Sequence, residues 1–223
     1  MDKIAIIVAG GTGSRMNTNI PKQFLFIAGL PILMHTIKKF RNFDNALRII
    51  VVLPEEQVKY WKKLCKEYRF KVQHEIRKGG ETRFHSVKKG LRGIKPGCLV
   101  AIHDGVRPLV SRNTIKRCFV QAAKTGAAIP VIDICESLRK VDGSENQMVD
   151  RDKYKLVQTP QVFVSNLLIK AFKKPYNESF TDDASVVETI KQKISLVEGN
   201  PENIKITSAL DLMIAEAYFR NVT

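Results

Sequence analysis

Short apolar segments alternate with longer amphipathic segments along the first part of the chain, and this alternation restricts the fold more than any other feature. The apolar segments are residues 4–8, 47–53, 98–103 and 127–132. The amphipathic segments, which we expect to be helices, are residues 31–42, 56–68, 82–92 and 112–125. This spacing predicts an α/β fold, in which a mostly parallel sheet carries helices on both faces. A last helix is expected at 207–220, with Thr207 or Ser208 as its N-cap.

Length and composition fit a single soluble domain. The chain has 223 residues, of which 44% are hydrophobic and 26% charged, and single α/β domains often reach this size. We therefore expect one domain over residues 1–223. No apolar run approaches the roughly 20 residues that a bilayer span needs, and the N-terminus lacks the layout of a signal peptide. These features predict a cytoplasmic protein with no membrane partner.

The net charge of +15 leaves several explanations open. Nucleic-acid binding, a small polyanionic substrate and a lysine-rich solvated surface are all compatible with it. The lysines are scattered along the chain, and they are not interleaved with aromatic residues as in RNA-recognition motifs. We therefore expect no nucleic-acid partner, and a basic nucleic-acid-binding protein is kept as the remote alternative. The four cysteines contain no CxxC pair, which favours free thiols over a zinc site or disulfides.

Residues 133–154 interrupt the alternation of strands and helices. The polar turn DGSEN separates two short alternating stretches, SLRKV and QMVD. Such a pattern predicts a hairpin that leaves the domain as an arm. An ordinary surface loop is the alternative, since polar loops are also rich in turn residues.

The segments that follow the predicted strands are the places to look for function. In parallel sheets, ligands bind at the carboxyl ends of the strands, and the unusual segments 9–24, 78–86 and 103–108 lie there. The first contains Gly10, Gly11 and Gly13, whose bare backbone can surround phosphate oxygens. It matches neither a Walker A loop nor the dinucleotide fingerprint.

Two cations accompany this glycine-rich loop. Arg15 and Lys22 would suit a triphosphate, whose charge needs compensation. For either residue alone, a solvated surface charge is the simpler interpretation.

Several motifs together resemble those of a known family. They are GGTGSRM, PKQF, GLPILMHTI, GGETRFHSVKKGL, IHDGVRPLV, DRDKYKLVQTPQVF, TDDASVVE and VEGNPENIKIT. The set covers nearly the whole chain and resembles the sugar-phosphate cytidylyltransferases. Thr82-Arg83 with Ser86-Val87, and the run Thr181–Ser185, favour the 2-C-methyl-D-erythritol 4-phosphate branch. The ribitol-5-phosphate cytidylyltransferases are the alternative.

The resemblance implies a Rossmann-like fold of the nucleotidyltransferase type and a cytidylyl transfer from CTP to 2-C-methyl-D-erythritol 4-phosphate. It assigns the stabilisation of charge during the transfer to Arg15, Lys22 and Lys205. The CTP-binding residues that it implies are Ala9, Gly10, Gly11, Gly13, Gly80, Glu81 and Ser86. The substrate-binding residues that it implies are Asp104, Arg107, Ser137, Arg151, Thr159 and Thr181.

The resemblance also implies a cofactor and a partner. Mg²⁺ is expected at Asp104, since this ion usually takes one or two carboxylates together with phosphate oxygens. A homodimer is expected through the arm, whose residues would complete the substrate site of the partner subunit. A relative that binds nucleotide without catalysis is disfavoured, because Arg15, Lys22, Asp104 and Lys205 are all present.

Overall fold

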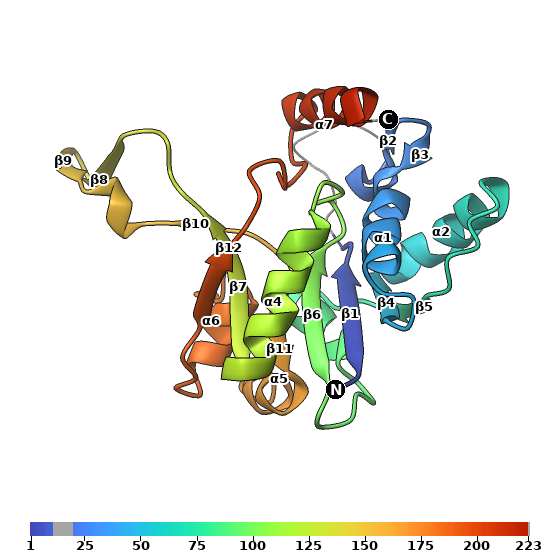
Figure 1. Ribbon diagram of the computed structural model, residues 1–223, viewed down its shortest axis with the longest axis horizontal. Coiled ribbons are helices and arrows are strands. Elements are labelled where there is room, and N and C mark those ends of the chain that lie inside the picture. Colours follow the sequence, from blue (N-terminus) through green and yellow to red (C-terminus); the bar gives the residue numbers. More distant parts are fainter. Residues whose placement is uncertain (11–19, 223) are drawn as a thin grey trace.

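One central sheet organises the computed structural model, which describes residues 1–10 and 20–222 (Figure 1). Its strands are β1 (Lys3–Val8), β4 (Arg48–Leu53), β5 (Glu75–Lys78), β6 (Leu99–Asp104), β7 (Ala127–Ile132), β10 (Leu156–Val157), β11 (Gln161–Val164) and β12 (Ser195–Glu198). Their order is β10-β7-β11-β6-β1-β4-β5, and β12 pairs with β7. The pairs β6–β1, β1–β4, β4–β5 and β7–β12 are parallel, whereas β11 runs antiparallel between β6 and β7. The sheet is therefore mostly parallel, as the sequence predicts.

The five predicted helices lie close to their predicted residues, and the described structure adds two short helices, α5 (Ser165–Ala171) and α6 (Asp183–Glu188), that were not predicted. The predicted ones are α1 (Ile32–Phe43), α2 (Glu55–Glu67), α3 (Arg83–Gly90), α4 (Arg112–Thr125) and α7 (Ala209–Val222). The hydroxyl of Ser208 accepts a hydrogen bond from the amide of Asp211, while the Asp211 carboxylate accepts from the amide of Ser208. This reciprocal cap places the start of α7 where the sequence predicts it. None of the described helices is long and apolar enough to cross a membrane.

The sheet separates two large layers of the core, one on each face, and β1 shows how they are divided. Along this strand, Ala5 and Ile7 join the hydrophobic cluster of one face, whereas Ile4 and Ile6 join that of the other. The first cluster includes side chains of α1, α2 and α4, and the second includes side chains of α3, α5 and α6. Because successive strand residues point to opposite faces, a buried strand must be apolar throughout. This explains the continuous apolar runs in the sequence.

Several strands escape the sequence prediction. The edge strand β5 has the sequence EIRK, and β12 has the sequence SLVE with alternate residues exposed. Such short, partly charged strands lack the apolar signal of the central ones, and charge at an edge is a common protection against aggregation. Strand β11 is almost fully buried, but its four residues are too few to show a period.

The arm is a two-stranded hairpin of β8 (Leu138–Asp142) and β9 (Glu145–Val149), as predicted for residues 133–154. Figure 1 shows that it projects away from the rest of the domain. Gly143 in its turn has φ 57°, a left-handed conformation that glycine adopts without strain. Val141 and Met148 are 69% and 73% exposed, so these two apolar side chains of the hairpin are open to solvent.

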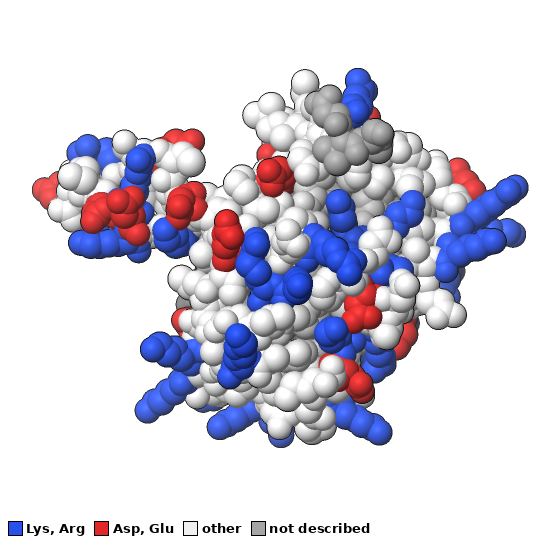
Figure 2. Space-filling model, in the orientation of Figure 1, with Lys and Arg blue, Asp and Glu red and all other residues white. Residues whose placement is uncertain are grey.

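The basic side chains are dispersed over the face of the molecule that Figure 2 shows. Lysine and arginine side chains lie on the body as well as on the arm, and acidic side chains lie among them, most clearly on the arm (Figure 2). A nucleic-acid-binding face usually gathers its cations into one patch or stripe. The face in view therefore has the pattern of a lysine-rich solvated surface.

Hydrogen bonds hold a buried histidine, His35, and a half-buried one, His74. The His74 Nε2 accepts a hydrogen bond from Trp61 Nε1, at 3.0 Å, and its protonated Nδ1 donates to the Val72 carbonyl, at 2.7 Å. The His35 Nε2 lies 2.7 Å from the Ile27 carbonyl, to which it donates. Burial lowers the pKa of both imidazoles below the ordinary value of 6.5.

These lowered pKa values predict a stability that decreases on mild acidification. The unfolded chain takes up protons near pH 6.5 that the folded chain refuses, so the free energy of unfolding should fall from about pH 7.5 to about pH 5.5. Urea titrations at the two pH values measure the fall, and it should be smaller in His74→Gln. An equal or higher free energy of unfolding at the lower pH would contradict this prediction.

Candidate active site

A cavity of 230 Å³ lies at the carboxyl ends of β1 and β6. Its lining residues are Val8, Ala9, Gly10, Lys22, Gln23, Gly80, Glu81, Thr82, Arg83, Ser86, Asp104, Val106 and Lys205. All of the unusual segments that follow the predicted strands contribute to it. Its position agrees with the rule that ligands of parallel sheets bind beyond the carboxyl ends of the strands.

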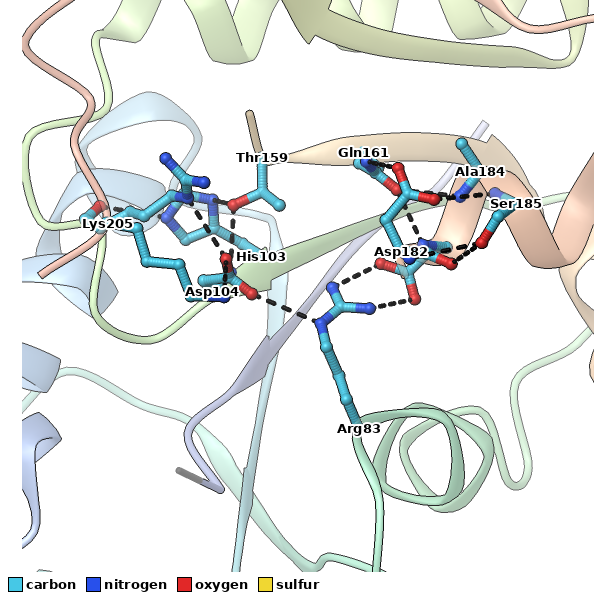
Figure 3. A network of polar contacts seen from close by, with 11 residues as sticks. Arg83, His103, Asp104, Thr159, Gln161, Asp182, Ala184, Ser185 and Lys205 are labelled. Atoms are coloured by element: carbon cyan, nitrogen blue, oxygen red, sulfur yellow. Dashed lines mark hydrogen bonds and ion pairs between the residues drawn. The ribbon is translucent and has the colours of Figure 1, made fainter. Parts of the chain in front are cut away.

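Asp104, the last residue of β6, is surrounded by cations (Figure 3). Its Oδ2 lies 3.2 Å from Arg107 Nε and 3.2 Å from Lys205 Nζ, and its Oδ1 lies 3.5 Å from Arg83 Nε. Burial alone would raise the pKa of Asp104, but the charges of the three cations outweigh it and hold the pKa well below its usual range. Asp104 is therefore a permanent carboxylate that gathers cations at the floor of the cavity.

The backbone of Asp104 is fixed by a chain of hydrogen bonds. Its amide donates to Thr159 Oγ1 at 3.1 Å, the Thr159 hydroxyl donates to His103 Nδ1 at 2.9 Å, and the protonated His103 Nε2 donates to the Arg107 carbonyl at 3.1 Å. Burial lowers the pKa of His103 to about 4, so the imidazole is neutral at physiological pH. His103 links Thr159 to the Arg107 carbonyl inside the protein and does not line the cavity.

The loop before α3 presents backbone to the cavity. Thr82 caps the helix by accepting from the amide of His85, at 3.3 Å. The Ser86 hydroxyl accepts from the Gly80 amide at 3.1 Å and donates to the Gly80 carbonyl at 3.3 Å. A Cβ on Gly80 would lie 2.4 Å from the Cβ of His85, so this closed loop has no room for a side chain.

Gln23 fixes the other wall of the cavity. This fully buried side chain in the short helix η2 (Lys22–Phe24) donates through Nε2 to the Ala9 carbonyl, at 2.9 Å, and to Gln57 Oε1, at 2.5 Å. The Ala9 amide in turn donates to the Val52 carbonyl, at 2.9 Å. Gln23 thus ties the segment that carries Lys22 to the end of β1, and the sequence analysis did not identify it.

Comparisons with known proteins identify the family. The sequence profile of the 2-C-methyl-D-erythritol 4-phosphate cytidylyltransferases matches residues 3–221. The chain belongs to this family. The cytidylyltransferase of Phocaeicola vulgatus is 53% identical over 216 residues, with 97% of this chain and 99% of that protein covered. The one of Geobacillus thermodenitrificans is 36% identical over 220 residues, with 97% and 96% covered. The crystal structure of the Thermus thermophilus enzyme has a TM-score of 0.80 at 32% identity and covers 99% of this chain and all of that one.

The structure brings most of the residues implied by the cytidylyltransferase resemblance to one place. Those that line the cavity are Ala9, Gly10, Lys22, Gly80, Glu81, Ser86, Asp104 and Lys205. Arg107 lies beside them through its contact with Asp104, and its Nη1 donates to the Asn203 carbonyl at 2.7 Å. Gly11, Gly13 and Arg15 lie outside the described residues.

Four implied substrate-binding residues are placed elsewhere in this chain. Ser137 and Arg151 are exposed on the arm, where the Arg151 guanidinium donates to the Cys135 carbonyl. Thr159 is buried, and its only hydroxyl proton is given to His103. Thr181 is exposed just before α6. Their contacts with a substrate stay predictions.

Asp104 can serve Mg²⁺ only in part. Among residues 1–10 and 20–222, no group of at least three His, Cys, Asp or Glu side chains is arranged to hold a metal ion. One carboxylate is enough for Mg²⁺ when phosphate oxygens and water supply the other ligands. Both oxygens of Asp104 already face cationic side chains. An ion that arrives with a triphosphate would therefore have to displace one of these side chains from the carboxylate.

Proposed function

We propose that this chain transfers a cytidylyl group from CTP to 2-C-methyl-D-erythritol 4-phosphate, which gives 4-diphosphocytidyl-2-C-methyl-D-erythritol and pyrophosphate. One observation carries the proposal: in a chain of this family, a backbone-lined wall and the cations Lys22 and Lys205 share one cavity. The match of the family over residues 3–221 favours this reaction over the ribitol phosphate alternative and over nucleic-acid binding.

The nucleotide base fits the backbone-lined side of the cavity. Gly10 and Gly80 line it with backbone, and the amide and carbonyl of Gly80 are bonded to the hydroxyl of Ser86. Peptide groups can recognise the edge of a pyrimidine by hydrogen bonds, and the short side chains leave space for its flat ring. Glu81 at the rim of the same wall can accept hydrogen bonds from ribose hydroxyls.

The chemical step needs fixed positive charge more than a base. An oxygen of the phosphate monoester attacks the α-phosphorus of CTP, the new P–O bond forms, and the bond to the β-phosphate breaks with release of pyrophosphate. The monoester dianion is already a nucleophile, so no proton has to be removed from it. Lys22 and Lys205 are placed to offset the charge of two polyanions and of the leaving group.

Pyrophosphate release with CTP and each polyol phosphate in turn tests this function. We expect release with 2-C-methyl-D-erythritol 4-phosphate, and Lys22→Ala should lower kcat by about 10²–10³-fold, because a preorganised charge is typically worth that much. Lys62→Ala, at an exposed position of α2, is the matched control and should keep its activity. Release only with ribitol 5-phosphate, or a folded Lys22→Ala variant with normal kcat, would contradict the proposal.

We also propose Mg²⁺ as the cofactor, held by Asp104 together with phosphate oxygens of CTP. The ion would supply charge neutralisation at the phosphates. Chelation of divalent cations should therefore abolish pyrophosphate release, and added Mg²⁺ should restore it. Full activity after exhaustive chelation would show that the cations of the protein suffice.

The arm is proposed to form a homodimer. A two-stranded hairpin is marginal by itself in water, and this one exposes Val141 and Met148, while Tyr154 and Leu156 at its base are each 49% exposed. Arg151 sits on the arm, outside the cavity lining of its own chain. A second copy of the chain would cover the apolar side chains and receive Arg151 at its substrate site.

We further propose a cytoplasmic location, because both substrates are charged and water-soluble.

Subunit mixing tests the shared site. Arg151→Ala should raise the KM for the polyol phosphate more than the KM for CTP, and the Arg151→Ala and Lys22→Ala variants should each be weakly active alone. In a mixed dimer, one of the two sites would contain both native residues, so mixing should restore part of the activity. No gain over the sum of the separate activities would exclude a site that is shared in this way.

A further inference from the structure

The guanidinium of Arg83 joins two carboxylates that come from distant parts of the chain (Figure 3). Its Nη1 lies 2.9 Å from Asp183 Oδ1 and its Nη2 lies 2.6 Å from Asp183 Oδ2, which makes a bidentate pair. The remaining Nε lies 3.5 Å from Asp104 Oδ1. The planar fork of arginine suits this double task, because it presents several donors in one fixed plane.

Asp183 is a rigid anchor. Its side chain is only 1% exposed, and its amide donates to Gln161 Oε1 at 3.0 Å, as does the amide of Ala184. Asp182 and Ser185 cap the same helix start reciprocally. The start of α6 is thus tied to β11, and the Asp183 carboxylate cannot turn away from Arg83 without losing its partner in a buried place.

The ion pair links a residue of the cavity lining to the start of α6. Arg83 is the first residue of α3 and directly follows Thr82, which ends the loop assigned to the nucleotide base. Asp183 lies two residues after Thr181, which the family resemblance assigns to the polyol phosphate, and Arg83 also contacts Asp104. The loop itself is closed independently by the bonds between Ser86 and Gly80.

We propose that Arg83, paired with Asp183, is a positioning residue that sets the distance of the loop before α3 from Asp104 and from the segment that carries Thr181. The inference rests on the proposed function. Because the loop is closed by its own bonds, losing the pair should leave CTP binding largely intact and should misplace the polyol phosphate relative to it. A purely structural ion pair would change stability without this kinetic signature.

Arg83→Lys is the first test, because lysine keeps the charge and cannot hold two carboxylates in one plane. We expect kcat/KM for the polyol phosphate to fall about a hundredfold, since small misplacements of reacting groups have effects of this size. The KM for CTP should change by less than about threefold. The matched control is Arg77→Lys, since Arg77 Nη1 donates to the Gly90 carbonyl at the other end of α3, at 2.8 Å, outside the cavity. The control should retain wild-type constants.

A double-mutant cycle separates a pair that acts as a unit from two independent residues. Arg83→Gln and Asp183→Asn should each lower kcat/KM. The kcat/KM of the double variant should be about equal to that of the less active single variant. Multiplied effects in the double variant would overturn the proposal. If Arg83→Lys does not fold, Asp183→Asn decides, and a folded Asp183→Asn enzyme with wild-type kcat/KM overturns the proposal.

The wild-type enzyme and Arg77→Lys distinguish the failure of this inference from the failure of the proposed function. If both release pyrophosphate and Arg83→Lys does so equally well, only the positioning role is wrong. If neither releases pyrophosphate with any polyol phosphate, the proposed function fails and this inference fails with it.

Discussion

The site depends on the ion pairs that the Asp104 carboxylate makes with three cations. Asp104 lies at the end of the central strand β6 and gathers Arg83, Arg107 and Lys205, which come from different segments of the chain. Cations placed so close together would repel one another without an anion between them. Asp104 and the Asp183 that pairs with Arg83 supply two carboxylates against three cations, which leaves an excess of positive charge, as two polyanionic substrates require. The carboxylate of Asp104 therefore allows the cations to lie close together, and the cluster keeps a net positive charge.

The surrounding fold keeps this anion in place. Thr159 and His103 hold the backbone of Asp104 from one side, and the pair of Arg83 with Asp183 holds its side chain from the other. His103 ends a buried apolar run and stands next to Asp104 in the sequence, an arrangement that suggests a catalytic base. Its hydrogen bonds and lowered pKa show that it is neutral and internal. The charge of the site thus does not come from His103.

The sequence was sufficient for the fold class, the central strands, the long helices and the hairpin, because each has a local signal of periodicity or turn chemistry. It was also sufficient to place most of the cavity in three loops after strands. It could not reveal the partnership of Arg83 with Asp183, which are 100 residues apart. Nor could it reveal Gln23, whose role depends on the Ala9 carbonyl lying within reach after folding. Thr159 was assigned to substrate by resemblance, and only the folded chain shows that its hydroxyl is committed to His103.

The antiparallel course of β11 has a consequence for how the enzyme can vary. Because β11 runs antiparallel to β6, with Gln161 beside Ile102, β11 begins at the carboxyl end of β6, where the cavity lies. The two ends of the excursion are already joined there, since Leu156 pairs with Ile132 and Val157 with Val131. The hairpin can therefore gain or lose residues between these clamped ends while the cavity keeps its geometry.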